Sequence, residues 1–431
     1  ILPELMLEKA KHTVGEFNKM GGGYILSSSI LSKILSFLVS LVAIRLLLPE
    51  TYGQIVFATS VIQFILPFMG GGAHIGVLRY GPLMETHEER QSLFNKSLSI
   101  GLLISLGLWV FTVILAMSGV FNEQNSTLFI CLLGLQVIIH YPFELFKSHQ
   151  RVQIQNKAFS AMDLIHQGLA LALLFTIPYL GGYGYILALL CAPLVAVAFA
   201  SQNQKKHGGW KAKPIEWPQK FWSYSLKTSM NNTASFMVYV LDFFLIGVLL
   251  NDSVQLAGYR AASLIPNSLN FVPIAFITTH YVHLSKNYLN RSYLDTFIKK
   301  YFALFIPIGI AVSTGLWLFS GWILPFFFGA EYVAFSRILQ ILSLGVMGIF
   351  CLRIPFGNLL AGVGQASQNL TISLITLALN LILNLILIPK FGIAGAAWAT
   401  VISLWFSGFV ALLFFVKYLN SLTHDTRQNH Q

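Results

Sequence analysis

The sequence predicts an all-α integral membrane protein with twelve transmembrane helices in two six-helix bundles. Hydrophobic residues make up 55% of its 431 residues and charged residues only 10%, whereas a soluble domain carries about 25% charged residues. Apolar stretches long enough to cross a bilayer recur along the chain, and Lys and Arg gather in most of the alternate connectors. This composition excludes a soluble globular enzyme. It also excludes a disordered chain, which needs low hydrophobicity and high charge.

Twelve stretches approach the roughly 20 apolar residues that a transmembrane helix needs. The expected spans are 24–48, 53–78, 93–118, 127–147, 156–179, 182–202, 222–250, 255–283, 297–319, 333–354, 366–388 and 392–417. Basic residues cluster before the first span and after the second, fourth, sixth, eighth and twelfth spans, whereas the odd-numbered spans are followed by short connectors nearly free of them, Lys390 being the exception. Because basic loops stay in the cytoplasm, this pattern places both termini there.

The spans divide the chain into two similar halves with short flanking segments. The expected segments are a cytoplasmic N-terminal segment (1–23), an N-terminal six-helix bundle (24–202), a basic cytoplasmic linker (203–221), a C-terminal six-helix bundle (222–418) and a cytoplasmic tail (419–431). The linker and the other inner loops hold most of the basic residues behind the net charge of +11. We interpret that charge as a sign of topology and of contact with membrane lipids, not of a nucleic-acid partner.

Three sequence matches indicate an internal repeat. The matches are Pro142-Phe143 and Gln155-Asn156 with Pro355-Phe356 and Gln368-Asn369 (offset 213), the pattern I-P-x-x-G-x-x-G at 177–184 and 388–395 (offset 211), and Gly53 with Gly258 (offset 205). Each half holds an even number of spans, so both halves have the same orientation, related by a pseudo-two-fold axis along the membrane normal. This geometry is typical of transporters that work by alternating access.

Three motifs resemble those of bacterial polysaccharide biosynthesis proteins of the O-antigen flippase type. They are Leu47-Leu48-Pro49-Glu50-Thr51-Tyr52-Gly53, the stretch Arg353-Ile-Pro-Phe-Gly-Asn-Leu-Leu-Ala-Gly-Val-Gly-Gln, and Asn380-x3-Asn384-x3-Ile388-Pro389-x2-Gly392-x2-Gly395-Ala396-Ala397-x-Ala399-Thr400. That family is part of the multidrug/oligosaccharidyl-lipid/polysaccharide (MOP) exporter superfamily. The resemblance covers about 24–418 and implies a MATE-like fold.

The resemblance also implies a function. It implies a flippase of the bacterial inner membrane that moves undecaprenyl-pyrophosphate-linked oligosaccharide repeat units of O-antigen, capsule or exopolysaccharide from the cytoplasmic to the periplasmic leaflet by alternating access. A polysaccharide polymerase and a chain-length regulator are the implied protein partners.

Ionisable residues inside the spans are the candidate functional residues, because a charge in the bilayer is costly unless it faces a cavity or a partner. Lys33, Arg45 and Arg260 are expected to bind the pyrophosphate, since Arg and Lys suit phosphate groups. Asn231 and Asn232 are expected to hydrogen-bond the sugars. Alternatively, Arg45 snorkels to the surface and the Asn side chains only join neighbouring helices.

The acidic residues Asp163 and Asp242 have two open roles. Either carboxylate could bind a coupling ion, or it could form an ion pair that joins two helices, as Asp242 would with Arg260. Pro67, Gly70 and Gly71 in the second span, and Pro266 and Pro273 in the eighth, are expected to act as hinges. The alternative is a set of static kinks, because Pro removes a backbone hydrogen bond.

No motif indicates an enzyme or a cofactor. The sequence contains no Walker A, HExxH or GxSxG pattern, and Cys131, Cys191 and Cys351 have no metal-ligand spacing. We therefore expect no catalytic residue, metal or cofactor. A cation-coupled multidrug or small-molecule antiporter of the same superfamily remains the alternative. A membrane-embedded polysaccharide polymerase or ligase would need a large external loop, and a passive scaffold would not need buried charges.

Overall fold

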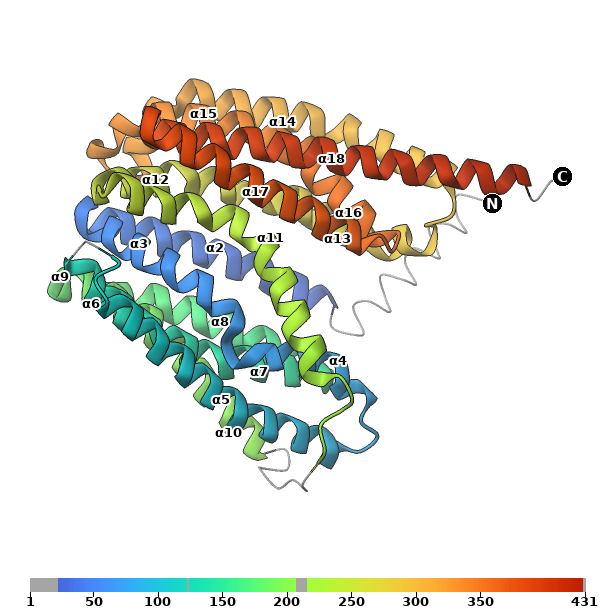
Figure 1. The fold of residues 1–431 in the computed structure, drawn as a ribbon, viewed down its shortest axis with the longest axis horizontal. Helices are drawn as coiled ribbons and strands as arrows, with labels where there is room; N and C mark the ends of the chain where they lie inside the picture. The colour runs from blue at the N-terminus through green and yellow to red at the C-terminus, as the bar shows by residue number, and fades with distance from the viewer. Residues whose placement is uncertain (1–21, 122–123, 207–214, 429–431) are drawn as a thin grey trace. The chain divides into compact units, whose positions relative to one another are not determined.

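The computed structural model describes residues 22–121, 124–206 and 215–428, and these residues form helices with short connectors and no strand (Figure 1). The all-α prediction is confirmed. Ten described segments are long and apolar enough to cross a membrane. The expected span 222–250 coincides with α11 (Phe221–Leu250), which holds only a shorter apolar stretch. The expected span 255–283 coincides with two separate helices, α12 (Ser253–Leu269) and α13 (Phe271–Lys286). The count of twelve membrane crossings stays a prediction.

The helices belong to two compact units. The first comprises the described parts of Ile1–Leu47 and Val61–Met230, and the second comprises Leu48–Ser60 and the described parts of Asn231–Gln431. The linker expected at 203–221 lies partly outside the described residues, so the division of the chain at that linker stays a prediction.

The first unit is built from the early helices of the chain. Its elements are α2 (Gly22–Leu46), the later part of α3 (Pro49–Ile65), η1 (Leu66–Gly72), α4 (Ala73–Tyr80), η2 (Gly81–Leu83), α5 (His87–Met117), α6 (Gln124–Gly134), α7 (Gln136–Val152), α8 (Asn156–Leu173), η3 (Leu174–Thr176), α9 (Ile177–Leu180), α10 (Gly182–Lys206) and the start of α11. Helix α8 packs between α2 and α10, while α7 packs against α4, α5 and α10. Buried aromatic side chains fill this core, as where Phe94 meets Phe146 at a ring-centroid distance of 4.9 Å.

The second unit holds the later helices and the start of α3. Besides most of α11, α12 and α13, its elements are α14 (Arg291–Phe328), η4 (Ala330–Phe335), α15 (Ser336–Gly348), the π-helical η5 (Ile349–Arg353), α16 (Ile354–Gly362), α17 (Ala366–Phe391) and α18 (Ile393–Gln428). Helix α18 lies beside α17 and α15 (Figure 1). The buried Tyr301 ring stacks on Phe305 at 4.4 Å, and its hydroxyl donates a 2.8 Å hydrogen bond to the Phe350 carbonyl.

The repeated I-P-x-x-G-x-x-G segments adopt the same turn in both halves. Gly181 has φ 55° and ψ −133°, and Gly392 has φ 59° and ψ −143°. The Gly181 amide donates to Ile177 O over 2.7 Å, and the Gly392 amide donates to Ile388 O over 2.8 Å. Only glycine adopts this backbone conformation without strain. The pattern therefore marks a real structural repeat.

The connectors after α7 and α16 repeat as well. In the first, the Gln155 amide donates to Gln150 O over 2.8 Å, and in the second the Gln365 amide donates to Leu360 O over the same 2.8 Å. Ile154 and Gly364, which precede these residues, both have positive φ, at 57° and 82°. The two turns thus correspond at an offset of 210 residues, whereas the Gln-Asn pairs match in the sequence at an offset of 213.

The second expected span is broken where the glycines occur. Gly70, Gly71 and Gly72 have φ values of 57°, 61° and 73°, which separate α3 from α4 through η1. The Gly70 amide donates a 2.9 Å hydrogen bond to Ser105 Oγ, and Ser229 Oγ donates to the carbonyl of Pro67. Side chains therefore satisfy backbone groups that the break frees, as a helix break within a membrane requires.

The eighth expected span is divided at Asn270, between α12 and α13. Pro266 lies inside α12, and Pro273 lies near the start of α13. Both prolines are buried. Breaks thus occur in the second and eighth expected spans, which are corresponding members of the two halves. Their movement as hinges stays a prediction.

Candidate functional site

The carboxylate of Asp242 on α11 is the centre of a buried polar cluster in the second unit. Only 3% of this residue is exposed. Tyr259 on α12 donates its hydroxyl to Asp242 Oδ2 over 2.8 Å, and Asn384 on α17 donates its amide to Oδ1, also over 2.8 Å. Thr400 on α18 donates a further hydrogen bond to Oδ2. Four helices therefore converge on one carboxylate.

The Asn-x3-Asn motif supplies one side of this Asp242 cluster. Asn380 and Asn384 are one helical turn apart, so they lie on the same face of α17. The Asn384 amide nitrogen also lies 3.1 Å from Asn380 Oδ1, and both residues are fully buried. Asn384 Oδ1 and Asn380 Nδ2 are both buried without a hydrogen-bond partner. A buried acceptor without a donor is costly, which makes it a candidate ligand for a cation.

The chemistry of the Asp242 cluster suits a monovalent cation. It offers carboxylate, amide and hydroxyl oxygens, and its only formal charge is that of Asp242. Na⁺ takes oxygen ligands of this kind, and a proton can bind the carboxylate directly. No group of three or more His, Cys, Asp or Glu side chains suited to a metal ion occurs among the described residues.

Arg260 and Asp242 have different partners. The guanidinium of Arg260 on α12 hydrogen-bonds the side chain of Tyr52 on α3, and its Cζ lies 5.0 Å from the centre of the Phe243 ring. Tyr52 is only 2% exposed, while Arg260 is half-buried. Among the described residues, Arg260 has no carboxylate partner. Tyr52, which belongs to the motif at 47–53, thus positions the guanidinium of Arg260.

The other expected substrate-binding residues are spread over both units. Lys33 and Arg45 lie on α2 in the first unit, and both side chains are exposed. Asn232 on α11 is also exposed. The side chain of Asn231 lies outside the described residues. The assignment of these residues to substrate binding stays a prediction.

Asp163 on α8 forms an ion pair that joins two helices of the first unit. Its Oδ1 lies 2.9 Å from Nζ of Lys147 on α7, and Lys147 also lies 3.2 Å from Glu144 Oε1. This partner was not expected, because the fourth span was predicted to end at Lys147, whereas α7 continues to Val152. The longer helix keeps Lys147 inside the unit, with 14% of its side chain exposed.

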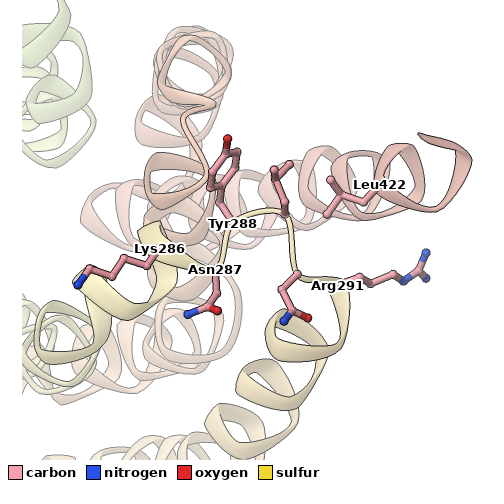
Figure 2. Close-up of a pocket in the computed structure, with 7 residues that line it drawn as sticks. Lys286, Asn287, Tyr288, Arg291 and Leu422 are labelled. Atoms are coloured by element: carbon pink, nitrogen blue, oxygen red, sulfur yellow. The ribbon is translucent and has the colours of Figure 1, made fainter. Parts of the chain in front are cut away.

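A cavity of about 500 Å³ lies at the connector between α13 and α14 (Figure 2). It is lined by Lys286, Asn287, Tyr288, Leu289, Asn290, Arg291 and Leu422. Figure 2 shows the side chains of Lys286 and Arg291 pointing away from each other. Arg291 instead contacts Asp295, with 3.6 Å between Nε and Oδ2. The cavity therefore lacks converging charges that would hold an anion.

Comparison with known proteins places this fold among membrane transporters. The inward closed conformation of the lipid II flippase MurJ is similar with a TM-score of 0.72, at 15% identity, over 93% of this chain and 89% of that chain. An inward-facing multidrug resistance MATE family transporter of the MOP superfamily is similar with a TM-score of 0.74, at 13% identity, over 91% of this chain and 96% of that chain. At these identities the likeness shows the fold, and the expected MATE-like architecture is confirmed.

The sequence comparison then gives the family. The model described as polysaccharide biosynthesis protein matches residues 42–337, which is more than half of the chain, so the chain belongs to this family. The resemblance found from the motifs is therefore confirmed. The similar structures are those of a flippase and a transporter, in agreement with the expectation that the chain is not an enzyme.

Two archaeal proteins match parts of the chain. The uncharacterized membrane protein MJ1068 of Methanocaldococcus jannaschii is 39% identical over 100 residues, 23% of this chain and 19% of that protein. The probable low-salt glycan biosynthesis flippase Agl15 of Haloferax volcanii is 26% identical over 189 residues, 43% of this chain and 39% of that protein. Both matches span less than half of the relative's length.

Proposed function

We propose that this multi-pass membrane protein is a flippase for a lipid-linked oligosaccharide. Arg260 is the observation that carries the proposal. It is a half-buried cation held by Tyr52 and, among the described residues, lacks a carboxylate partner. Such a group suits an anionic headgroup, since a charge that enters the membrane needs a counter-charge. The family match and the printed function of the Haloferax relative support this reading.

The finer form of the proposal follows from the resemblance. The cargo is an undecaprenyl-pyrophosphate-linked repeat unit of O-antigen, capsule or exopolysaccharide, which moves from the cytoplasmic to the periplasmic leaflet of a bacterial inner membrane. Both termini are cytoplasmic, as the basic connectors predict. Lys33 and Arg45 add positive charge along the path, and Asn231 and Asn232 bind sugar hydroxyls. A polymerase and a chain-length regulator act on the product.

Asp242 is the proposed site of ion coupling. Its cluster supplies the oxygen ligands of a cation site, and the orphaned Asn384 Oδ1 gives the site a ligand with free capacity. A cation bound there would neutralise the carboxylate and change the hydrogen bonds among α11, α12, α17 and α18. Occupancy could in this way alter the packing of the second unit during the transport cycle.

A multidrug antiporter is the second candidate, because the fold is as similar to the MATE transporter as to MurJ. The two functions differ in the charge of the cargo. An anionic lipid headgroup is attracted by Arg260, whereas a cationic drug is repelled by it. Neutralising Arg260 should therefore impair a flippase and should spare or improve the export of cationic drugs.

Deletion of the gene in its own host tests the proposed function. The expected result is accumulation of lipid-linked repeat units on the cytoplasmic side and loss of the surface polysaccharide, with both restored by the wild-type gene and not by an Arg260→Gln variant present at the same level. Normal surface polysaccharide and no accumulated precursor would overturn the proposal. Increased drug sensitivity without a polysaccharide defect would favour the antiporter.

A further inference from the structure

Another cavity lies within the second unit, where α15 packs against both α14 and α18 (Figure 1). It holds about 330 Å³, which is within the range of small-molecule sites. Its walls include Trp317 of α14, Leu344 and Met347 of α15, and Trp405 of α18. We call it the tryptophan pocket. All three helices fall within candidate membrane spans.

The lining of the tryptophan pocket is apolar and open to the surface. None of the described residues that border it carries a charge. Ser313 is one of two hydroxyl residues there, and its Oγ is buried without a hydrogen-bond partner, so this oxygen is not accessible to a ligand. Thr314, the other hydroxyl residue, is exposed, as are Trp317 and Leu344. Because this surface belongs to candidate spans, the pocket opens towards hydrocarbon chains and not towards water.

Hydrogen bonds between helices hold the walls of the pocket in place. Trp405 Nε1 donates to Leu344 O over 3.0 Å. Gly348 allows the indole to lie close to α15, since an added Cβ there would be 3.1 Å from Cδ2 of Trp405. The carbonyl of Trp317 accepts a 3.3 Å hydrogen bond from Gln340 Nε2, which joins α14 to α15. The pocket is therefore preformed, and a ligand does not have to order it.

The tryptophan pocket lies near the middle of the bilayer. Trp317 is 11 residues before the end of α14 at Phe328, Met347 is 11 residues after the start of α15, and Trp405 is 12 residues after the start of α18. At 1.5 Å per residue, these residues lie about 17 Å from the helix ends. The midplane of a hydrocarbon core about 30 Å thick is at a similar depth. Membrane tryptophans are typical of the interface, so this pair does not belong to an aromatic belt.

The depth of the pocket favours a long hydrocarbon chain as its occupant. Water does not fill an apolar cavity at this depth. A phospholipid stays in one leaflet and brings only the ends of its chains to the midplane. An undecaprenyl tail is much longer than one leaflet is thick, so a segment of it can lie at the midplane while its headgroup is on either side of the membrane.

We infer that the tryptophan pocket binds a segment of the hydrocarbon tail of the lipid-linked substrate, an inference that rests on the proposed function. The bound segment keeps the substrate on the protein while its headgroup crosses. The attraction is close packing against the indole rings and Met347, because a transfer between two apolar media gains no hydrophobic free energy. The pocket is therefore selective through its shape and its depth.

Photocrosslinking in lipid nanodiscs tests this inference with the full chain. The photoreactive residue p-benzoylphenylalanine is introduced at Leu344, which lines the pocket, or at Leu318, a control position on α14 that is 60% exposed and lies outside the lining. Radiolabelled undecaprenyl phosphate and radiolabelled phosphatidylglycerol are the two probes. We expect undecaprenyl phosphate to label position 344 several times more than position 318, and phosphatidylglycerol to label both equally. Equal labelling of both positions by undecaprenyl phosphate, or preferential labelling of position 344 by phosphatidylglycerol, would overturn the inference.

A variant that fills the pocket tests its role in transport. Thr314→Phe places a ring at the open side of the pocket, whereas Leu318→Phe adds a ring to the same helix outside it. Thr314→Phe should remove the preferential labelling of position 344 and slow the transfer of the lipid-linked substrate, with an unfolding temperature equal to that of Leu318→Phe. Unchanged labelling in Thr314→Phe would contradict the inference. Undecaprenyl phosphate carries no glycan, so the labelling result is separate from the deletion test: a polysaccharide defect together with equal labelling refutes tail binding alone.

Discussion

The Asn384 side-chain amide lies 2.8 Å from Asp242 Oδ1 and thereby connects α17 to α11. The two residues are 142 positions apart in the sequence. Both are almost completely inaccessible, so the hydrogen bond forms in surroundings with few competing water molecules. The Asn-x3-Asn motif of the family resemblance thus lines one side of a site around a buried acid.

The hydroxyl of Thr400 is expected to be essential to the Asp242 cluster. Thr400→Val keeps the size of the side chain but removes its donor to Asp242 Oδ2. The loss should lower the free energy of unfolding by about 1–3 kcal/mol, as for other buried polar groups left without a partner. Thr400→Ser keeps the hydroxyl and is the matched control. Thermal unfolding in detergent measures the loss of stability, and the ion dependence of transport measures the effect on the Asp242 cluster. Equal behaviour of Thr400→Val and Thr400→Ser would contradict a role for the hydroxyl.

Removal of the Asp242 charge should abolish ion coupling while the fold survives. Asp242→Asn retains the shape of the side chain and one acceptor oxygen, but it cannot bind a cation as a carboxylate does. We expect transport driven by a sodium or proton gradient to fall to the level of protein-free vesicles, with the protein still present in the membrane. Undiminished gradient-driven transport in this variant would place the coupling site elsewhere.

Tyr52 is expected to act through Arg260. Tyr52→Phe keeps the buried ring and removes the hydroxyl that bonds the guanidinium. One hydrogen bond to a charged group contributes about 1.5–3 kcal/mol, so transport should fall by roughly ten-fold or more, and Arg260→Gln should reduce it further. Lys300→Gln, an exposed basic residue on α14, serves as the control. The double variant, with Tyr52→Phe and Arg260→Gln combined, tests whether the two residues act together. If it lowers transport by the product of the two single-variant effects, the residues act independently and the prediction is wrong.

The repeated glycine turns give a paired prediction for the two halves. Gly181→Ala and Gly392→Ala each place a side chain at a positive φ, of 55° and 59°. Such strain should lower stability by about 1–3 kcal/mol at each position. Gly168→Ala and Gly315→Ala are the matched helical controls, one in each half, because an added Cβ there meets open space. These controls should be neutral or stabilising by up to about 1 kcal/mol, and thermal unfolding distinguishes the two pairs.

The break between α3 and α4 should not tolerate a side chain at Gly70. A Cβ built there lies 1.9 Å from Cε2 of the buried Tyr141, so the ring or the break must move. We expect Gly70→Ala to unfold at a lower temperature than the wild type and to transport less. Gly107→Ala on α5, where an added Cβ meets nothing within 4 Å, is the control. Unfolding temperatures that agree between the two variants would show that the break is adaptable.

Much of the architecture could be predicted from the sequence because its signals are local. A bilayer requires a long apolar run for each span, and the low charge and the alternating basic connectors reveal where those runs begin and end. The glycines of the I-P-x-x-G-x-x-G segments indicated a repeat, since their backbone conformation excludes most other residues. Pro67 and the following glycines indicated a hinge or a kink in the second span for the same local reason. Each of these features depends on neighbours in the sequence.

Partners across helices were decided only by the tertiary structure. Asp242 and Arg260 stood as a possible ion pair, yet Asp242 bonds Tyr259, Asn384 and Thr400, while Arg260 bonds Tyr52. The fourth span was predicted to end at Lys147, but α7 is longer and brings this residue to Asp163. The choice among such partners depends on which faces of distant helices pack together. That choice follows from the summed packing of many apolar side chains, and no single motif contains it.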